Sequence, residues 1–342
     1  MLDIDGAHGE GGGQLVRTAV ALAAIRGTPI RLSSARAARR NPGLAPQHVA
    51  AVRAVASMCD ARCDGVEPRS TGFTFAPGRL RGGHFRVDVG TAGSITLVLQ
   101  AMLPVAAACG ERCAISIRGG TDVRAAPPMD YFRFVLLPLL ERLGLRAALT
   151  VERRGYYPRG GGEVHLQVAP APRLSPFVVD DAGQGDGIDI RAHVAQLPRE
   201  IAERMVDAAR RALPAALRID AQVESVGAEH SGGPGGAIVL CARTPATVLG
   251  AAQVAERGVR AERLGQLAAE DLAADLRARA TLDVHATDQM PVFLALAQGQ
   301  SRFRARELSS HARTTMWLLE RFGAARFAVQ QRVGAVRVQV GG

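Results

Sequence analysis

Gly9-Glu10-Gly11-Gly12-Gly13-Gln14-Leu15-Val16-Arg17 is the most informative stretch of this sequence, because it marks where the first of several similar units begins. Its glycines precede an apolar segment, Gln14–Ile25, that we expect to form a helix. Backbone N–H groups in such a turn can approach an anion closely, and the helix N-terminus adds positive potential. Glu10 could hold a divalent cation on the bound anion. The run matches neither GxGxxG nor a Walker loop, so a tight turn without a ligand is the alternative.

The same order of elements occurs three times: a marked turn, a helix, a strand, a second helix and a strand pair, with a period of about 80 residues. Hydrophobic periodicity and turn residues define these elements. The expected helices are Gln14–Ile25, Pro46–Met58, Ile95–Ala108, Pro128–Leu143, Asp288–Ala297 and His311–Phe322. The expected strands are Pro29–Ser33, Gly72–Phe75, Phe85–Val89, Cys113–Ile117, Ala147–Val151, Glu163–Val168, Ala280–Val284, Ser301–Arg306, Arg326–Gln330 and Ala335–Val340. The pattern predicts an α/β (α+β) fold.

Residues 185–279 look different from the three copies. They follow an acidic, glycine-rich segment, Asp180–Gly187, contain a long expected helix near Arg199–Leu213, and include a glycine-rich run, Ser231–Gly236, that we interpret as a flexible loop. They carry 12 Arg against 13 acidic residues, net −1, whereas the rest of the chain carries 30 Arg against 19 acidic residues, net +11. We expect a small α/β domain at 185–279, inserted into a large domain formed by 1–184 and 280–342.

The charge composition indicates a polyanionic partner. The chain has 342 residues and a net charge of +10, which favours nucleic acid, a nucleotide or a phosphorylated metabolite. All 42 basic residues are arginine. Because a guanidinium stays protonated and is a poor nucleophile, this excludes a lysyl-adenylate, a Schiff base and the lysine of a phosphate-binding loop. Aromatic residues make up only 4%, so recognition of a nucleic-acid end fits better than a long base-stacking platform.

Targeting signals and disulfide patterns are not evident. No stretch approaches the ~18 consecutive apolar residues of a membrane span, and Met1–Asp5 does not resemble a signal peptide. We expect a soluble, cytoplasmic protein with reduced cysteines. Two C-x3-C pairs, Cys59 with Cys63 and Cys109 with Cys113, have a spacing that zinc allows, but they lack nearby histidines, and a structural role is favoured.

His311 differs from the other histidines. Ser309 and Ser310 are N-cap candidates directly before it, which places its ring in a first helical turn, where the helix dipole disfavours imidazolium. A neutral imidazole with a free lone pair is what attack on phosphorus requires. Arg313 could neutralise nearby phosphate oxygens, although a surface histidine at a helix start is the plainer interpretation. Four others, His84, His165, His193 and His230, have no convergent partners that the sequence reveals.

Two further clusters admit either a functional or a structural explanation. His285-Ala286-Thr287-Asp288-Gln289 lies at an expected strand-to-helix junction, where Asp288 could simply cap the helix. Arg36, Arg39 and Arg40 lie beside an Asn-Pro-Gly turn, where guanidinium groups suit phosphate binding but could equally form a solvated face.

Taken together, these motifs resemble those of the RNA 3′-terminal phosphate cyclase family over essentially the whole chain. The residues that carry the resemblance are Gly9–Gln14 with Arg17, Arg36 with Pro42-Gly43-Leu44 and Gln47-His48, Gly90 with Ala92-Gly93-Ser94 and Leu97–Gln100, Gly119-Gly120-Thr121-Asp122 with Ala126-Pro127-Pro128, Gly155–Pro158 with Gly160-Gly161-Gly162, Asp288-Gln289, and His311.

The resemblance implies a large domain of repeated βαβαββ units with a small inserted α/β domain. It also implies a three-step reaction that uses ATP and is normally assisted by Mg²⁺ or Mn²⁺. A histidine takes adenylate from ATP and releases pyrophosphate, an RNA 3′-terminal phosphate accepts the adenylate, and the 2′-hydroxyl closes a 2′,3′-cyclic phosphate with release of AMP.

The resemblance also implies roles for individual residues, namely those that stand at the positions of the family's functional residues. His311 is the expected nucleophile, Glu10 and Gln14 orient the triphosphate, and Glu10 also binds the metal. The residues expected to line the adenosine site are Gln100, Pro128, His285, Ala286, Thr287, Asp288 and Gln289, and those expected to contact phosphate or RNA are Arg17, Arg36 and Arg39. The family commonly carries Tyr where His285 stands, so adenine stacking would differ here.

Two other functions are compatible with the same fold. Relatives without the histidine are non-catalytic proteins of ribosome assembly, an alternative that the net charge of +11 outside residues 185–279 permits and that His311 argues against. A transferase acting on a small phosphorylated metabolite is the third, since related repeats serve enolpyruvyl transfer. Pyrophosphate release from ATP alone would distinguish the cyclase from both. The oligomeric state is not predicted.

Overall fold

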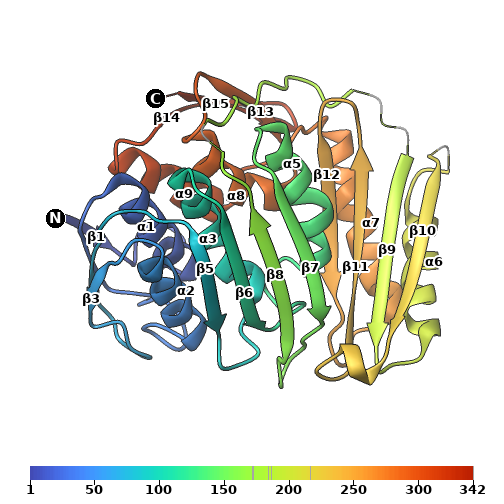
Figure 1. The fold of residues 1–342 in the computed structure, drawn as a ribbon. Helices are drawn as coiled ribbons and strands as arrows, with labels where there is room; N and C mark the ends of the chain where they lie inside the picture. Colours follow the sequence, from blue (N-terminus) through green and yellow to red (C-terminus); the bar gives the residue numbers. More distant parts are fainter. Residues whose placement is uncertain (172, 184, 186, 216, 342) are drawn as a thin grey trace.

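The first two repeats form sheets of identical topology (Figure 1). The computed structural model describes residues 1–342 except 172, 184, 186, 216 and 342. In each of the two sheets the first two strands are parallel and the other neighbours antiparallel, with orders β1-β2-β4-β3 and β5-β6-β8-β7. The strands are β1 (Leu2–Asp5), β2 (Ile30–Ser33), β3 (Arg62–Asp64), β4 (Phe73–Ala76), β5 (Gly83–Asp88), β6 (Cys113–Gly119), β7 (Ala147–Arg153) and β8 (Gly162–Val168).

Helices from these repeats pack against one another in the main core. Every residue of α1 from Gln14 to Ala24 is buried, so this helix is covered on all sides rather than along one stripe. Gly27 ends it in the left-handed conformation, at φ 60°. The helices are α1 (Gly13–Arg26), α2 (Pro46–Ser57), α3 (Ile95–Cys109), α4 (Met129–Tyr131), a π-helical turn η1 (Phe132–Leu136) and α5 (Leu137–Arg142). The last three together replace the single helix expected at Pro128–Leu143.

The third repeat lacks its first strand. Its sheet has the order β13-β15-β14, all antiparallel, which matches the last three strands of the other repeats. The elements are α8 (Val284–Leu294), β13 (Ser301–Ala305), α9 (Ser310–Arg321), β14 (Arg326–Arg332) and β15 (Ala335–Gly341).

The strand expected at Ala280–Val284 was therefore wrong, and its hydrogen bonds explain why. The N–H of Thr281 still donates to the carbonyl of Arg304, but the Thr281 side chain, not its carbonyl, accepts from the Arg304 N–H. The Thr281 carbonyl instead accepts from the hydroxyl of Thr247. Because its backbone oxygen points away from β13, the segment cannot continue the ladder.

Residues 187–277 form a fourth sheet with its own hydrophobic core. The order is β10-β9-β11-β12, and α6 and α7 pack on it to bury a separate apolar cluster that runs from Ile188 to Ala280. The sheet stands beside β5-β6-β8-β7 in Figure 1. The elements are β9 (Gly187–Ala195), α6 (Arg199–Ala212), β10 (Ile219–Val226), a short 3₁₀ turn η2 (Ala228–His230), β11 (Gly235–Arg243), β12 (Val248–Val254) and α7 (Ala261–Arg277). The exact boundaries of an inserted domain at 185–279 stay a prediction.

The segment Ser231–Gly236 is not the flexible loop that its glycines suggested. Ser231 is 1% exposed, and its hydroxyl donates to the Gly227 carbonyl and accepts from the Gln196 amide. Gly235 already begins β11. The glycines allow close packing instead, since a Cβ on Gly232 would collide with the backbone of Gly160.

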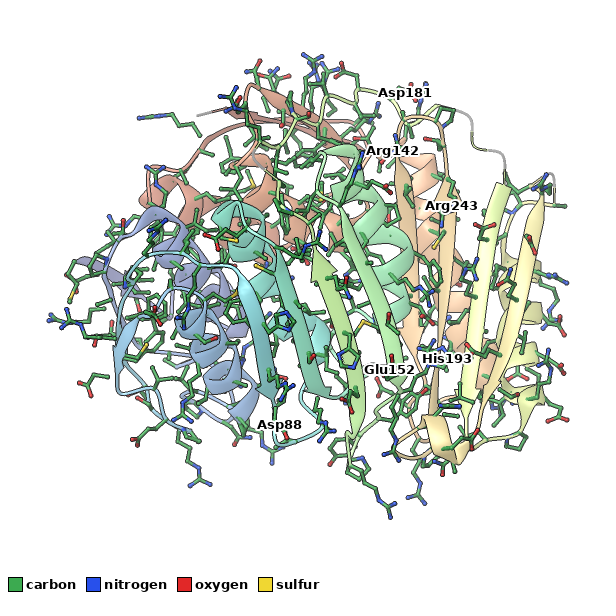
Figure 2. All side chains as sticks on the ribbon, viewed as in Figure 1. Asp88, Arg142, Glu152, Asp181, His193 and Arg243 are labelled. Atoms are coloured by element: carbon green, nitrogen blue, oxygen red, sulfur yellow. The ribbon has the colours of Figure 1, made fainter. Side chains whose placement is uncertain are left out.

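A buried group of four charges lies where this fourth sheet meets the second repeat. His193, on β9, lies with its Nδ1 3.2 Å from an Asp130 oxygen and its Nε2 3.7 Å from an Asp122 oxygen. Arg154 makes ion pairs with the same two carboxylates, at 2.9 and 3.4 Å. Figure 2 shows His193 near the lower end of β11, on the side where the two sheets adjoin. The inference that His193 lacks convergent partners was wrong, because Asp122 and Asp130 are far from it in sequence.

Asp283 joins three parts of the chain through one buried carboxylate. Its Oδ1 accepts hydrogen bonds from the Tyr131 hydroxyl at 2.6 Å and from the Ala286 N–H at 2.9 Å, and its Oδ2 accepts from the Gly250 N–H at 2.9 Å. These donors belong to the second repeat, the third repeat and β12. Asp283, not Asp288, is therefore the N-cap of α8, and the helix starts four residues earlier than expected.

Among the described residues, no helix is long and apolar enough to cross a membrane.

Asp283→Ala is expected to lower the free energy of unfolding by about 4 kcal/mol, because it leaves three buried donors without an acceptor at roughly 1–3 kcal/mol each. Asp283→Asn keeps one acceptor oxygen, so its loss should be intermediate. Urea denaturation measures both. Asp3→Ala, at an exposed strand position, is the control and should stay within about 0.5 kcal/mol of the parent. An equally small effect at Asp283 would contradict the role of this carboxylate as a junction.

His193→Asn is expected to cost more stability at pH 6 than at pH 9. Burial and the positive charge of Arg154 lower the pKa of His193, but the nearby carboxylates of Asp122 and Asp130 outweigh them and raise the pKa. Stability from the protonated ring is therefore complete below its unfolded pKa of about 6.5 and is lost as the pH rises through the higher folded pKa. Urea denaturation of both proteins at the two pH values measures this, with exposed His230→Asn as control. A difference independent of pH would refute it.

Candidate active site

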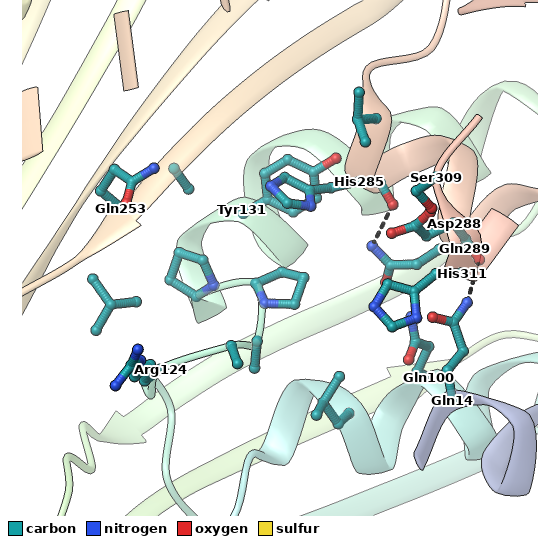
Figure 3. A pocket seen from close by; sticks show the side chains of 18 of the residues that line it. Gln14, Gln100, Arg124, Tyr131, Gln253, His285, Asp288, Gln289, Ser309 and His311 are labelled. Atoms are coloured by element: carbon teal, nitrogen blue, oxygen red, sulfur yellow. Dashed lines mark hydrogen bonds between the residues drawn. The ribbon is translucent and has the colours of Figure 1, made fainter. Parts of the chain in front are cut away.

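A cavity of about 450 Å³ lies between the helices of all three repeats and β12 (Figure 3). His311 stands at one end, and Arg124 and Gln253 stand at the other. The side chains that line the cavity come from α1, α3, α8, α9, from α4 and the segment before it, and from the end of β12 and the residues just after it. They are Gln14, Arg17, Leu97, Gln100, Arg124, Ala125, Ala126, Pro127, Pro128, Tyr131, Ala252, Gln253, Val254, Glu256, Val284, His285, Asp288, Gln289, Ser309 and His311.

His311 is the second residue of α9 and so lies in the first helical turn, as the sequence predicted. The N-cap is Ser309, whose hydroxyl accepts from the Ala312 N–H at 3.0 Å. Partial burial lowers the pKa of the His311 ring below its ordinary value, and the positive charges of Arg17 and Arg39 lower it further, while Asp288 opposes them. The ring is therefore neutral at pH 7, which leaves a lone pair for nucleophilic attack.

Glu10 lies directly behind His311. Its side chain is only 7% exposed, and its Oε2 is 3.5 Å from Nδ1 of His311. Neither atom has a hydrogen-bond partner among the described residues. Arg39 makes an ion pair with the same carboxylate, and the Glu10 N–H donates to the Thr314 hydroxyl at 3.1 Å. A carboxylate facing Nδ1 favours the tautomer with the proton on Nδ1, so that the lone pair of Nε2 is free.

Gln14, Arg17 and Gln100 connect the first turns of α1 to α3, α8 and α9. The Gln14 amide donates to the Asp288 carbonyl at 3.0 Å and to the Thr315 hydroxyl at 2.9 Å. The Arg17 guanidinium donates twice to the Gln100 side-chain oxygen, at 3.3 and 3.0 Å. Burial lowers the pKa of Arg17 to about 9, so it stays positively charged at pH 7. Gln14 and Arg17 are thus held in fixed positions at the edge of the cavity.

On α8, the helical period separates the expected residues into two sets. His285, Asp288 and Gln289 are three and four residues apart and face the cavity. Ala286 and Thr287 are 0% exposed and do not line the cavity, so the structure does not place them with the other residues expected at the adenosine site. His285 packs edge-on against Tyr131, with ring centroids 5.8 Å apart, and Pro128 lines the wall nearby. Asp288 accepts from the Ser309 hydroxyl and so ties α8 to the N-cap of α9.

Arg36 lies outside the cavity lining. Its Nη1 donates to the carbonyls of Asn41 and Gly43, at 3.0 and 2.7 Å, and this closes its own loop. Arg39, three residues on, leaves that loop and reaches Glu10. The two arginines that the sequence treats alike therefore have different surroundings.

Several cavity residues were not predicted. Ala252, Gln253 and Val254 come from β12, and Glu256, just beyond it, makes an exposed 3.6 Å ion pair with Arg124. No local motif distinguishes Gln253. The segment 124–128 overlaps a stretch that carries the family resemblance, Gly119–Asp122 with Ala126-Pro127-Pro128, but the sequence predicts no role for its alanines or for Pro127.

A metal centre made by the protein alone is not present in the described part of the chain. No group of three or more His, Cys, Asp or Glu side chains there could hold a metal ion. Cys109 and Cys113 are free thiols whose sulfur atoms are 3.5 Å apart. The hydrogen-bonding contact with the Cys113 thiol lowers the pKa of Cys109 to about 6.

Comparison with known proteins agrees with the geometry. The model of the family described as RNA 3′-terminal phosphate cyclase matches residues 8–329. A protein of that name from Nitrosospira multiformis is 52% identical over 99% of this chain and 96% of its own length. Proteins of the same name from Pyrobaculum aerophilum and Methanopyrus kandleri are 39% and 42% identical, over 99% and 94% of this chain and 97% and 93% of their own lengths.

Among solved structures, the enolpyruvyl transferase NikO from Streptomyces tendae is similar with a TM-score of 0.40 and 13% identity, over 98% of this chain and 47% of that one. That likeness is too weak to carry an argument. The fold and the cavity, with the full-length relatives, define an α/β enzyme built from repeated units. The chain belongs to the RNA 3′-terminal phosphate cyclase family.

The His311 ring is expected to titrate below pH 6.5, and Arg39→Gln should raise its pKa, because this change removes a nearby positive charge and leaves Glu10 without its ion pair. Histidine-selective NMR over pH 4–9 measures both. Arg313→Gln, at an exposed position on the same helix, is the matched control. A ring that titrates above 6.5 in the parent protein would show that the carboxylates dominate over burial.

Proposed function

We propose that this enzyme converts the 3′-terminal phosphate of RNA to a 2′,3′-cyclic phosphodiester at the expense of ATP, in the cytoplasm. In the first step, Nε2 of His311 attacks the α-phosphorus of ATP, the bond to the bridging oxygen breaks, and pyrophosphate leaves. An oxygen of the RNA 3′-phosphate then displaces His311 from that phosphorus. Finally the 2′-hydroxyl loses its proton and attacks the 3′-phosphorus, which expels AMP.

The observation that carries the proposal is the neutral His311 at the N-terminus of α9 with Glu10 behind Nδ1. As Nε2 bonds to phosphorus, the ring becomes positively charged, and a carboxylate at 3.5 Å stabilises that charge and can accept a hydrogen bond from Nδ1. The phosphorus–nitrogen bond is reactive enough to pass adenylate to a phosphate.

The cavity fits the nucleotide part of ATP. Its volume of about 450 Å³ lies within the usual range of roughly 300–1,000 Å³ for small-molecule sites. We place adenosine between Pro128 and His285, with Gln100 and Gln289 beside it and the α-phosphate near His311. The β12 residues close the far end, so we also propose that 185–279 acts as a domain that completes the site.

Three arginines are proposed to contact phosphate, with different roles. Arg17 is held by Gln100 at the cavity edge and can neutralise the triphosphate. Arg39 reaches Glu10 from the outer side, where the RNA phosphate would enter. Arg36 shapes the loop that carries Arg39, and its N–H groups not used by Asn41 and Gly43 remain for an anion.

The residues present fit Mg²⁺ or Mn²⁺ held mainly by phosphate. Glu10 has a buried carboxylate oxygen that no hydrogen bond satisfies within the described chain. Hard cations of this type commonly use one or two carboxylates together with substrate phosphate oxygens and water. A cation bound there would neutralise phosphate charge, and Gln14 beside it would orient the triphosphate.

His311→Ala is expected to abolish transfer of label from α-labelled ATP to the protein, by at least about 10³-fold, without loss of folding. The parent protein should give an acid-labile, alkali-stable adduct and one pyrophosphate per active site, because a phosphorus–nitrogen bond hydrolyses in acid. His230→Ala, an exposed histidine outside the cavity, is the control and should label normally. Labelling that persists in His311→Ala would exclude this residue as the nucleophile.

A further inference from the structure

The glycine-rich turn runs antiparallel to α9 and contacts it at three successive positions. Glu10 faces His311, the Glu10 N–H donates to Thr314, and His8 stacks on Trp317. The His8 and Trp317 rings are 3.7 Å apart between centroids and inclined by 16°. His311 and Trp317 are six residues apart, or about 9 Å along the helix axis. Six residues also rotate the helix by about 240°, so the aromatic pair lies farther along α9 and about 120° around it from His311, and residues 8–10 connect the two places.

The pair lies outside the nucleotide cavity. Neither His8 nor Trp317 lines it, and the cavity extends from His311 toward Gln253, away from the glycine-rich turn (Figure 3). His311 thus has the cavity on one side and Glu10, followed by His8, on the other. His8 is exposed, and because Trp317 covers one side of its ring, the accessible part faces away from Trp317.

Arginines flank the aromatic pair along the helix. Arg313, Trp317 and Arg321 are four residues apart, so they share one face of α9 at intervals of about 6 Å. Both arginines are exposed, and within the described chain neither makes an ion pair with a carboxylate. The Nη2 of Arg321 donates to the backbone carbonyl of Asp3. Both guanidinium groups are therefore available to bind phosphate.

We propose that the His8–Trp317 stack is the docking platform for the terminal bases of the RNA substrate, with Arg313 and Arg321 bound to the adjoining phosphates. The inference rests on the proposed function, because it assigns the acceptor of the adenylate to this face. Unpaired RNA bases stack on Trp and His rings, and arginines track the backbone. The axial separation of about 9 Å from His311 is a lower limit on the path, because the two side chains also point in different directions around α9. A single strand of at least three nucleotides, at about 3.4 Å each, that curves around the helix would bring its terminal phosphate to His311.

The sequence supports a short platform rather than a long one. Trp317 is the only tryptophan, and aromatic residues are 4% of the chain. A stack of one tryptophan and one histidine beside the nucleophile suits an enzyme that needs only the end of a strand.

The single tryptophan provides a direct test, since its fluorescence reports on this site alone among tryptophans. A short RNA with a 3′-phosphate, titrated without ATP, should change Trp317 fluorescence saturably. His8→Ala should weaken RNA binding and raise the KM for RNA roughly tenfold, because stacking of one base is worth about 1–3 kcal/mol. His8→Phe, which keeps a ring that can stack, should retain most of the affinity for RNA. His230→Ala is the control at another exposed histidine.

A second measurement separates this role from positioning of Glu10. Labelling of the enzyme by ATP alone should proceed at the parent rate in His8→Ala, since no RNA is involved. A rate that falls together with the loss of RNA affinity would overturn the platform, and so would an unchanged KM for RNA. Arg313→Gln with Arg321→Gln should reduce the salt dependence of binding by about two charges, and an unchanged slope would count against the phosphate contacts.

Failure of the proposed function gives a different result. A parent protein that never takes label from ATP, yet whose Trp317 fluorescence responds to RNA and loses the response in His8→Ala, keeps the platform and loses the cyclase reaction. A parent protein that takes label but whose fluorescence ignores RNA keeps the reaction and loses the platform.

Discussion

The carboxylate of Asp283 is the contact on which the arrangement of the other parts depends. It accepts hydrogen bonds from Tyr131, Gly250 and Ala286, which come from the second repeat, β12 and the third repeat. Burial raises the pKa of this carboxyl, while the charge interaction with nearby His285 and the three hydrogen bonds oppose that rise. Because Tyr131 and α8 both form cavity walls, the same bonds that join the parts also fix the width of the site.

Repetition made most of the fold predictable. Hydrophobic period and turn residues are local signals, so the helices and strands of each copy could be placed before their partners were known. The errors arose where a residue far away in the sequence determines the local structure. The strand expected at Ala280–Val284 is absent because Thr247 takes the Thr281 carbonyl, and α8 starts early because Tyr131 and Gly250 hold Asp283 in its capping position. Neither partner could be inferred from its neighbours in sequence.

The residues of the candidate site likewise fall into those that local motifs predict and those that only the folded chain brings to the site. His311, Glu10, Gln14 and Arg17 stand in local motifs, and the structure brings them together. Gln253 has no motif, since only the folding of the fourth sheet brings β12 to the cavity. Ala286 and Thr287 belong to a motif whose helical period turns them inward. His193 shows the same limit, because its two carboxylates come from another repeat.

The separation of Glu10 from His311 in the sequence has a consequence for synthesis. Glu10 precedes His311 by about 300 residues, so the glycine-rich turn leaves the ribosome long before His311 does. A nascent or truncated chain that ends before α9 carries the glycine-rich turn without His311, the proposed nucleophile that faces it. Such a fragment cannot consume ATP by the proposed route, so the chemistry begins only after the last repeat has closed over the first.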